Sequence, residues 1–209
     1  MRIIRNFIVG LLLVFVGIAA IMLIPSPQPP ASKPWEVTVM TDNNISVFGI
    51  HLGNTDYKTA QEELRIFGKT AIFTDPDNKA TVEAYFDSVN LGGLSAKMVL
   101  NLDVPEDKVA AMLQRASVGK LQPSGAHQHE LVEEDKQFLL SSPVAAITYI
   151  PSVRLSREMI QERFGEPDSI DVGLPDDKGN TSESWSYQAL NLTVIFGSTG
   201  KTILIYQTK

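Results

Sequence analysis

Two hydrophobic patterns divide this chain. Residues 7–24 form an unbroken run of 18 apolar or small residues, with Arg2 and Arg5 before it. As a helix rising about 1.5 Å per residue, the run covers roughly 27 Å, which is enough to cross the hydrocarbon core of a membrane. The arginine pair predicts a cytoplasmic N-terminus and a folded part on the far side. The first pattern therefore predicts a single-pass transmembrane helix, with residues 1–24 as the anchor.

A cleaved signal peptide has the same charge pattern and is the alternative interpretation. The apolar run is longer than a signal-peptide core of about 7–15 residues, and no small-residue cleavage pattern follows it. The uncleaved anchor is therefore favoured. Residues 25–34 contain five prolines, which is typical of a stiff extended spacer, and we assign residues 25–36 as a linker.

The second pattern fills the rest of the chain, where short β-branched runs alternate with segments of helical periodicity. An apolar stripe predicts a helix over residues 55–67, which Gly68 ends. Another helix is predicted after Asp103, whose side chain is in the position of an N-cap. A third is predicted from Glu133 to Ser142. The stripe residues are Tyr57, Ala60, Leu64 and Phe67 in the first helix, Val109, Met112, Leu113 and Ala116 in the second, and Phe138 and Leu139 in the third.

The clearest helical pattern begins at Ser156. Ser156 is a favourable N-cap, Ile160 and Phe164 are expected in the core, and Gly165 with Pro167 ends the helix. Strands are predicted over residues 35–41, 45–50, 71–74, 81–87, 95–102, 144–150, 168–172, 192–196 and 202–206, with Gly92-Gly93 as a hairpin turn.

The order of elements after Phe67-Gly68 coincides with the order after Phe164-Gly165, although few residues are identical. Chance similarity of two generic units is the alternative. With residues 118–130 as the loop between halves, the predicted fold class is α+β. It has an N-terminal transmembrane helix followed by two tandem helix-on-antiparallel-sheet units, over residues 37–120 and 121–209. Such units leave one face of each sheet uncovered.

The segment from Ser156 to Asp168 resembles the SmpA/OmlA (BamE-like) family, together with Trp185-Ser-Tyr187, Leu192–Phe196 and Gly200-Lys201. In that family a helix with a Gly-x-Pro stop precedes a W-x-Y strand and an apolar strand followed by a Gly-Lys turn. The resemblance implies the fold shared with β-lactamase inhibitor proteins, which carry two such units in tandem. The family's lipidated cysteine is missing from this chain.

The whole chain also resembles a group of membrane-anchored proteins of Proteobacteria to which no activity is assigned. This resemblance implies an envelope protein but no chemistry. The shared motifs are Trp35–Val39, Val47–Gly53, Glu83–Phe86, Gly92–Ala96 and Thr148–Pro151.

Charge and cysteine content exclude several classes of protein. Arg2 and Arg5 are the charges of the anchor, so the remainder carries 16 basic and 24 acidic side chains, a formal charge of −8. An acidic chain without clustered Lys and Arg is not expected to bind nucleic acid. The absence of cysteine excludes disulfides, thiolate metal sites and a Cys nucleophile.

Two motifs are weak candidates for chemistry. Gly197–Thr202 is similar to the end of a phosphate-binding loop, but Ile195 stands where the first glycine is needed, so we expect a hairpin turn. His127 and His129 have the spacing of metal ligands on one face of a strand, but they lie in the expected loop and lack a third ligand. We expect solvated histidines, with metal binding by this pair left open. Nucleophile, base and metal motifs are otherwise missing, so we predict no enzyme and no cofactor.

Aromatic residues on the predicted strands are the remaining candidates for function. Tyr85, Phe86, Trp185 and Tyr187 would form an interaction surface if they face outward, and the alternative is that they pack in the core. We predict a non-enzymatic protein of the bacterial inner membrane whose periplasmic module binds another envelope protein. The alternative is a periplasmic small-ligand or cell-wall-binding protein with its site between the two units.

Overall fold

A computed structural model describes residues 32–175, 179, 181–197 and 200–209, together with residues 11, 14, 15 and 17. Residues from Ala31 to Lys209 form one compact unit. Most of the predicted anchor at 1–24 and most of the predicted linker lie outside the described residues. Among the residues that are described, no helix is both long and apolar enough to span a membrane.

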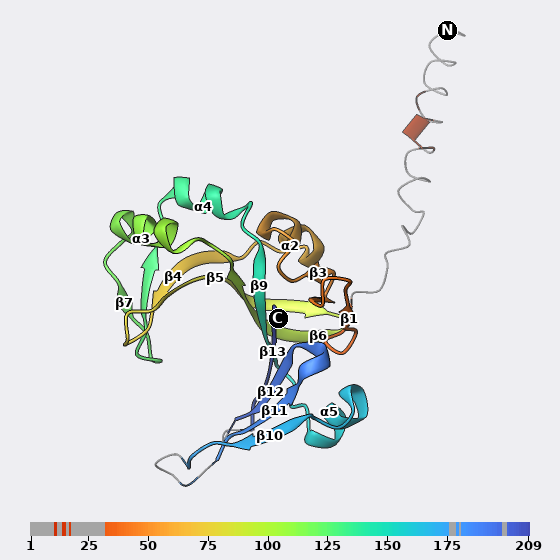
Figure 1. Ribbon diagram of the computed structural model, residues 1–209. Coiled ribbons are helices and arrows are strands. Elements are labelled where there is room, and N and C mark those ends of the chain that lie inside the picture. Colours follow the sequence, from red (N-terminus) through yellow and green to blue (C-terminus); the bar gives the residue numbers. More distant parts are fainter. Residues whose placement is uncertain are drawn as a thin grey trace, which may run out of the picture. The chain divides into compact units, whose positions relative to one another are not determined.

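The folded unit is built on a ten-stranded antiparallel sheet (Figure 1). The strand order is β10-β11-β12-β13-β9-β6-β5-β4-β8-β7. The strands are β4 (Lys69–Thr74), β5 (Ala80–Leu91), β6 (Leu94–Leu102), β7 (Lys120–Leu121), β8 (His127–Glu130), β9 (Val144–Pro151), β10 (Ser169–Val172), β11 (Glu183–Tyr187), β12 (Leu192–Phe196) and β13 (Thr202–Gln207).

A small sheet and four helices lie on one side of the large sheet (Figure 1). The small sheet has three strands, β1 (Thr38–Val39), β2 (Ile45–Val47) and β3 (Ile50–His51). The helices are α2 (Tyr57–Leu64), α3 (Glu106–Arg115), α4 (Glu133–Leu139) and α5 (Arg157–Phe164), and a 3-10 helix, η1 (Gln188–Leu190), joins β11 to β12.

The predicted fold class is wrong, because the described chain is mostly β-sheet and strands from both predicted units belong to one ten-stranded sheet. α2 and α5 each precede a three-stranded meander, β4-β5-β6 and β10-β11-β12. The meanders are joined through β9 and β13, where Tyr149 lies opposite Leu204 on one side and Met98 on the other. The spacing of apolar residues predicts local helices and strands, but it does not show which distant strands pair with each other.

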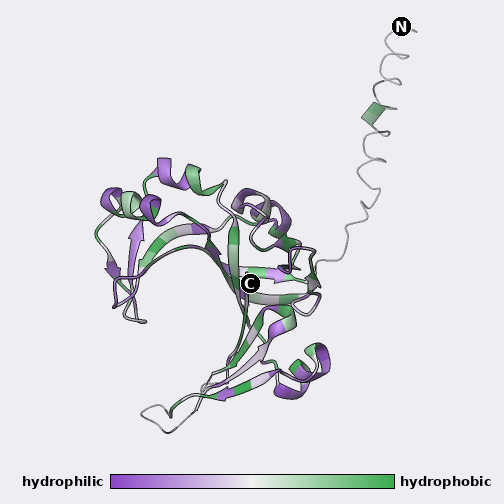
Figure 2. Cartoon of the chain, viewed as in Figure 1, coloured by the Kyte–Doolittle hydropathy of each residue, from purple (hydrophilic) through white to green (hydrophobic). Residues whose placement is uncertain are grey.

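The strand register divides the sheet into two faces. Leu100 lies opposite Ala84 on β5 and Ile147 on β9, and all three are fully buried. Side chains alternate along each strand, so these residues share the face that the helices and the small sheet cover. We call this the covered face, and we call the opposite side, over which no described helix or strand lies, the open face. Hydrophobic residues recur along the central strands, whereas the β7–β8 end is mostly hydrophilic (Figure 2).

The predicted first helix is confirmed, but its end is wrong. Tyr57, Ala60 and Leu64 are buried as predicted. The helix ends at Arg65, which takes the left-handed conformation at φ 55° expected of Gly68. The early stop leaves Phe67 outside the helix, and its side chain is 88% exposed.

The second and third helices also differ at their ends. Pro105, rather than Asp103, is the N-cap residue of α3, with no side-chain cap. α4 ends at Leu139 and not at Ser142. Of its two predicted core residues, Leu139 is buried, whereas Phe138 is exposed. The helix from Ser156 is confirmed: the Ser156 side chain accepts a hydrogen bond from the Met159 N–H, and Gly165 ends the helix at φ 82°.

Most predicted strands are present, but one predicted loop is wrong. Gly92 and Gly93 have positive φ and join β5 to β6 as predicted. Residues 118–130 contain β7 and β8, and β8 pairs with β4. The polar sequence of β8, His-Gln-His-Glu, lacks the β-branched residues from which strands were predicted.

An aromatic cluster lies at the centre of the covered face. Phe48 and Gly49 both have positive φ in the turn between β2 and β3, although this conformation is unfavourable for phenylalanine. The Phe48 ring packs at 5.2 Å from Tyr149 and 6.1 Å from Tyr206, between ring centroids. The Tyr206 hydroxyl donates to the Pro34 carbonyl at 2.5 Å. The start of the folded unit is therefore fixed to the middle of the large sheet.

Neighbouring residues of β6 provide a test of the two faces. Leu100→Ala should lower the free energy of unfolding by about 2–5 kcal/mol, because it leaves a cavity in the covered face. Val99→Ala, one residue earlier on the open face, should cost no more than about 1 kcal/mol, because its side chain is only half-buried. Urea unfolding measures both, and equal losses would contradict the assignment of faces.

Candidate interaction surface

The four aromatic residues predicted as a surface do not lie together. Phe86, Trp185 and Tyr187 are buried on the covered face. Trp185 packs against Phe196 with ring centroids 5.0 Å apart, and Tyr187 packs against Phe164 at 5.8 Å. These side chains are core residues, because their strand positions point towards the helices.

Tyr85 differs, because it alternates with Phe86 and lies on the open face, where it is half-buried. Gln128 donates a side-chain hydrogen bond to the Tyr85 hydroxyl at 3.2 Å. The Lys69 ammonium group lies 5.8 Å from the centroid of the Tyr85 ring. Of the four predicted residues, Tyr85 is the one that can take part in a surface on this face.

The open face carries a group of aliphatic side chains on four neighbouring strands, β6, β9, β13 and β12. They follow from the registers, because Val99 lies opposite Thr148, Thr148 lies opposite Ile205, and Ile195 lies opposite Ile203. All are half-buried. We call the following set the aliphatic patch: Val99, Ile150, Ile195, Ile203 and Ile205.

Polar side chains border the aliphatic patch towards β4 and β5. Lys69 forms an ion pair with Asp87 at 3.2 Å, and both are exposed. Glu83 accepts a hydrogen bond from the Thr81 hydroxyl at 3.1 Å. An aliphatic centre with a polar border is the arrangement found in protein interfaces.

Sequence reasoning missed the aliphatic patch, although β13 carries a signal for it. The strand reads Thr-Ile-Leu-Ile-Tyr-Gln, so Ile203 and Ile205 alternate with the buried Leu204 and Tyr206. A strand covered on one side commonly alternates between apolar and polar residues, whereas a continuous apolar run indicates that both faces are shielded from water. The run of β13 therefore indicated a second apolar face.

The histidines predicted in a loop lie instead on β8 and point to the covered face. His127 lies opposite Thr74, and His129 lies opposite Ile72. The His129 ring is 3.1 Å from the Thr74 hydroxyl and 3.2 Å from the Ser117 carbonyl. No group of three His, Asp or Glu side chains able to hold a metal ion occurs in the described part of the chain.

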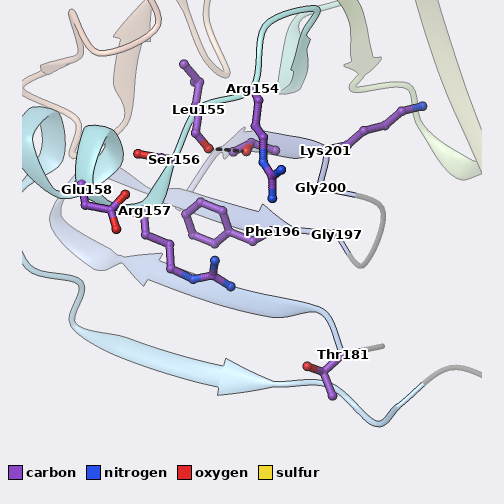
Figure 3. A pocket seen from close by; sticks show the side chains of 11 residues that line it. Arg154, Leu155, Ser156, Arg157, Glu158, Thr181, Phe196, Gly197, Gly200 and Lys201 are labelled. Atoms are coloured by element: carbon purple, nitrogen blue, oxygen red, sulfur yellow. Dashed lines mark hydrogen bonds between the residues drawn. The ribbon is translucent and has the colours of Figure 1, made fainter. Parts of the chain in front are cut away.

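A pocket of about 400 Å³ lies between the start of α5 and the β12–β13 turn (Figure 3). Three of its lining residues, Arg154, Arg157 and Lys201, are basic. The Arg157 Nε donates to Glu183 at 2.8 Å, and its guanidinium lies 4.8 Å from the Phe196 ring centroid. The side chains of Arg154 and Lys201 have no hydrogen bond or ion pair to other described residues.

The hydroxyl and carboxyl groups of this pocket have structural roles. The Ser156 side chain caps α5, and Thr202 donates to the Leu155 carbonyl at 2.7 Å. A hydrogen bond with Ser156 holds the pKa of Glu158 below its ordinary value, so this residue is a carboxylate at neutral pH. The pocket therefore offers cations to an anionic ligand, but its described residues do not pair a nucleophile with a base.

The predicted hairpin turn at Gly197–Thr202 is confirmed by the described residues at its two ends, which pair with each other. Gly197 donates to the Lys201 carbonyl at 2.8 Å, and Gly200 has φ 79°. A strand, β13, follows the turn, so this segment does not place a helix N-terminus behind a phosphate loop.

Comparison with protein-family models gives no match, and comparisons with curated proteins and with solved structures give none either. The resemblance to the SmpA/OmlA (BamE-like) family therefore stays a prediction from the motifs.

Glu83 on the open face allows a pH test of burial. Burial raises the pKa of its carboxyl above the ordinary value, against the opposing effect of the Thr81 hydrogen bond. The folded state then holds this proton more tightly than the unfolded chain, so stability is lost as pH rises above about 4.3. Glu83→Gln should unfold at a higher temperature than the unsubstituted protein at pH 7, with the difference vanishing near pH 3. A difference in Tm that does not change with pH would contradict the burial of this carboxylate.

Proposed function

We propose that this chain is a non-enzymatic protein-interaction module of the bacterial cell envelope, and that its open face binds another envelope protein. The observation that carries the proposal is the aliphatic patch. It lies at the centre of a ten-stranded sheet whose other face is covered by helices. An aliphatic surface left in contact with water is unfavourable, and a protein partner would remove it from water.

The arrangement suits a protein partner better than a small molecule. The patch extends over four adjacent strands, each roughly 4.7–4.9 Å from the next, so it is broader than most small ligands. Tyr85 and the Lys69–Asp87 pair at its border supply an aromatic group and charges for hydrogen bonds with a partner. Buried apolar contacts would give affinity, and the polar border would give specificity.

The cellular location belongs to the same proposal and rests on the sequence. The apolar run at residues 7–24, with Arg2 and Arg5 before it, supports attachment to the inner membrane with the N-terminus in the cytoplasm. The folded part would then face the periplasm. Its acidic composition is consistent with a protein partner and not with nucleic acid.

A second candidate function is favoured by the pocket beside α5. The side chains of Arg154 and Lys201 line this pocket without partners among the described residues, which suits an anionic small ligand. The pocket does not overlap the aliphatic patch in its lining residues. Substitutions can therefore test the two candidates separately.

Capture of a partner from solubilised membranes tests the first candidate. The double variant Ile150→Lys/Ile205→Lys should lose a stoichiometric protein partner that the unsubstituted full-length protein retains, because two ammonium groups would be buried without counter-charges. The matched control is Phe67→Lys, since Phe67 is exposed and lies outside the sheet.

Circular dichroism should give similar thermal unfolding for both variants, since neither substitution is in the covered face. Equal capture by the double variant and by the Phe67→Lys control would sink the proposal. Arg154→Ala/Lys201→Ala should leave capture unchanged, and loss of the partner in this variant alone would favour the pocket.

Protease access tests the proposed location. In intact spheroplasts, added protease should remove a tag placed after Lys209, while a cytoplasmic marker protein survives. Sequencing of the mature protein should begin at Met1 or Arg2. A tag that is protected until the membrane is lysed would contradict the periplasmic location. A mature chain that begins after Pro25 would contradict attachment through an uncleaved helix.

A further inference from the structure

One edge of the large sheet is apolar and unpaired among the described strands. β10 is the last strand at that end, and β11 is its one neighbour in the sheet order. Every residue of β10 is exposed. Ile170 is 51% exposed, Val172 is 68% exposed, and Leu174, just beyond the strand, is 92% exposed.

The backbone of this edge is available for hydrogen bonding. Gly173 N–H donates to the Ser182 carbonyl of the β11 side at 2.8 Å. In an antiparallel pair, alternate residues turn their N–H and C=O groups towards the same neighbour. Ser169 and Asp171 therefore bond with β11, whereas the groups of Ile170 and Val172 point away from the sheet.

Natural sheets protect their edges with very short strands, charges or proline. The opposite edge has two such protections, because β7 consists only of Lys120 and Leu121. On the β10 edge the one charged residue is Asp171, whose side chain alternates with those of Ile170 and Val172 and so points to the other face. The outward-facing positions carry no charge and no proline.

We propose that β10 is a self-association edge, at which a second copy of this chain pairs antiparallel through its own β10. The two-fold axis passes through Val172. Val172 then lies opposite Val172 of the second copy, and Ile170 lies opposite Leu174. All three exposed apolar side chains are paired in this register, and each pair uses outward-facing backbone groups.

Charge selects this register over its neighbour. With the axis at Asp171, two carboxylates would lie directly opposite each other at the short spacing of a non-hydrogen-bonded pair, which is unfavourable. With the axis at Val172, each Asp171 lies opposite Gly173 of the second copy. Pro175 is two residues after Gly173, so its backbone also faces β11 and not the second copy. The N–H that proline lacks is therefore not needed for pairing with the second copy.

Because the chain contains no cysteine, one introduced thiol reports this contact. The full-length protein in mild detergent is oxidised at several concentrations, and disulfide-linked dimer is measured on non-reducing gels. Val172→Cys should form at least tenfold more dimer than Val118→Cys, since Val118 is 95% exposed and lies away from β10. Equal cross-linking by the two variants would overturn the proposal.

A mixing experiment tests the register. Ile170→Cys protein mixed with a differently tagged Leu174→Cys protein should give mainly mixed dimers, because these positions are opposite only across the proposed axis. A preference for dimers of Ile170→Cys with itself would overturn the register.

Sedimentation of the protein without introduced cysteines gives an independent readout. Val172→Lys should weaken its dimer about tenfold, whereas Val118→Lys should not. A protein that stays monomeric at every concentration measured would overturn self-association altogether.

Discussion

The pairing of β9 with β13 is the interaction on which the folded unit depends. It joins two meanders that would otherwise end in unpaired strands, and it carries Tyr149 and Tyr206 at the centre of the covered face. Phe48 fills the space beside them from an unfavourable left-handed turn. The buried contacts of its ring offset the cost of that backbone conformation. The small sheet, the turn and the central strands are therefore stabilised together.

The helices and the small sheet cover one face of the large sheet, and aliphatic side chains on the other face are left in contact with water, which bears on function. The central strands β12, β13, β9 and β6 need apolar side chains on the covered face, and each of them carries an aliphatic residue on the open face as well. Packing of a single core does not require Ile203, Ile205 or Ile195 to be aliphatic. Their exposure to water is unfavourable in the isolated unit, which is why a protein partner on this face is the function that the arrangement supports best.

The sequence predicted local structure well and tertiary structure poorly. The Gly92-Gly93 hairpin and the Ser156 cap were predictable, because each depends on residues close in the chain. The join through β9 and β13 was not, since it brings together residues about sixty positions apart. For the same reason Trp185 and Tyr187 were candidates for a surface: strand alternation shows that two faces exist, but only the packing of α5 decides which face is buried. Arg65 ended a helix where Gly68 was expected, because in the left-handed conformation its N–H bonds to the carbonyls of the last turn, at Gln61 and Glu62, and residue propensity does not include this closure.

The hydrogen bond from Tyr206 to the Pro34 carbonyl has a mechanical consequence. It fastens the entering chain to β13, a central strand with a neighbour on each side. Tension applied through the preceding residues would therefore pass to β13 and from it to its neighbours β9 and β12. The β10 edge lies three strands away from β13 in the sheet and would not be the first part to carry that load.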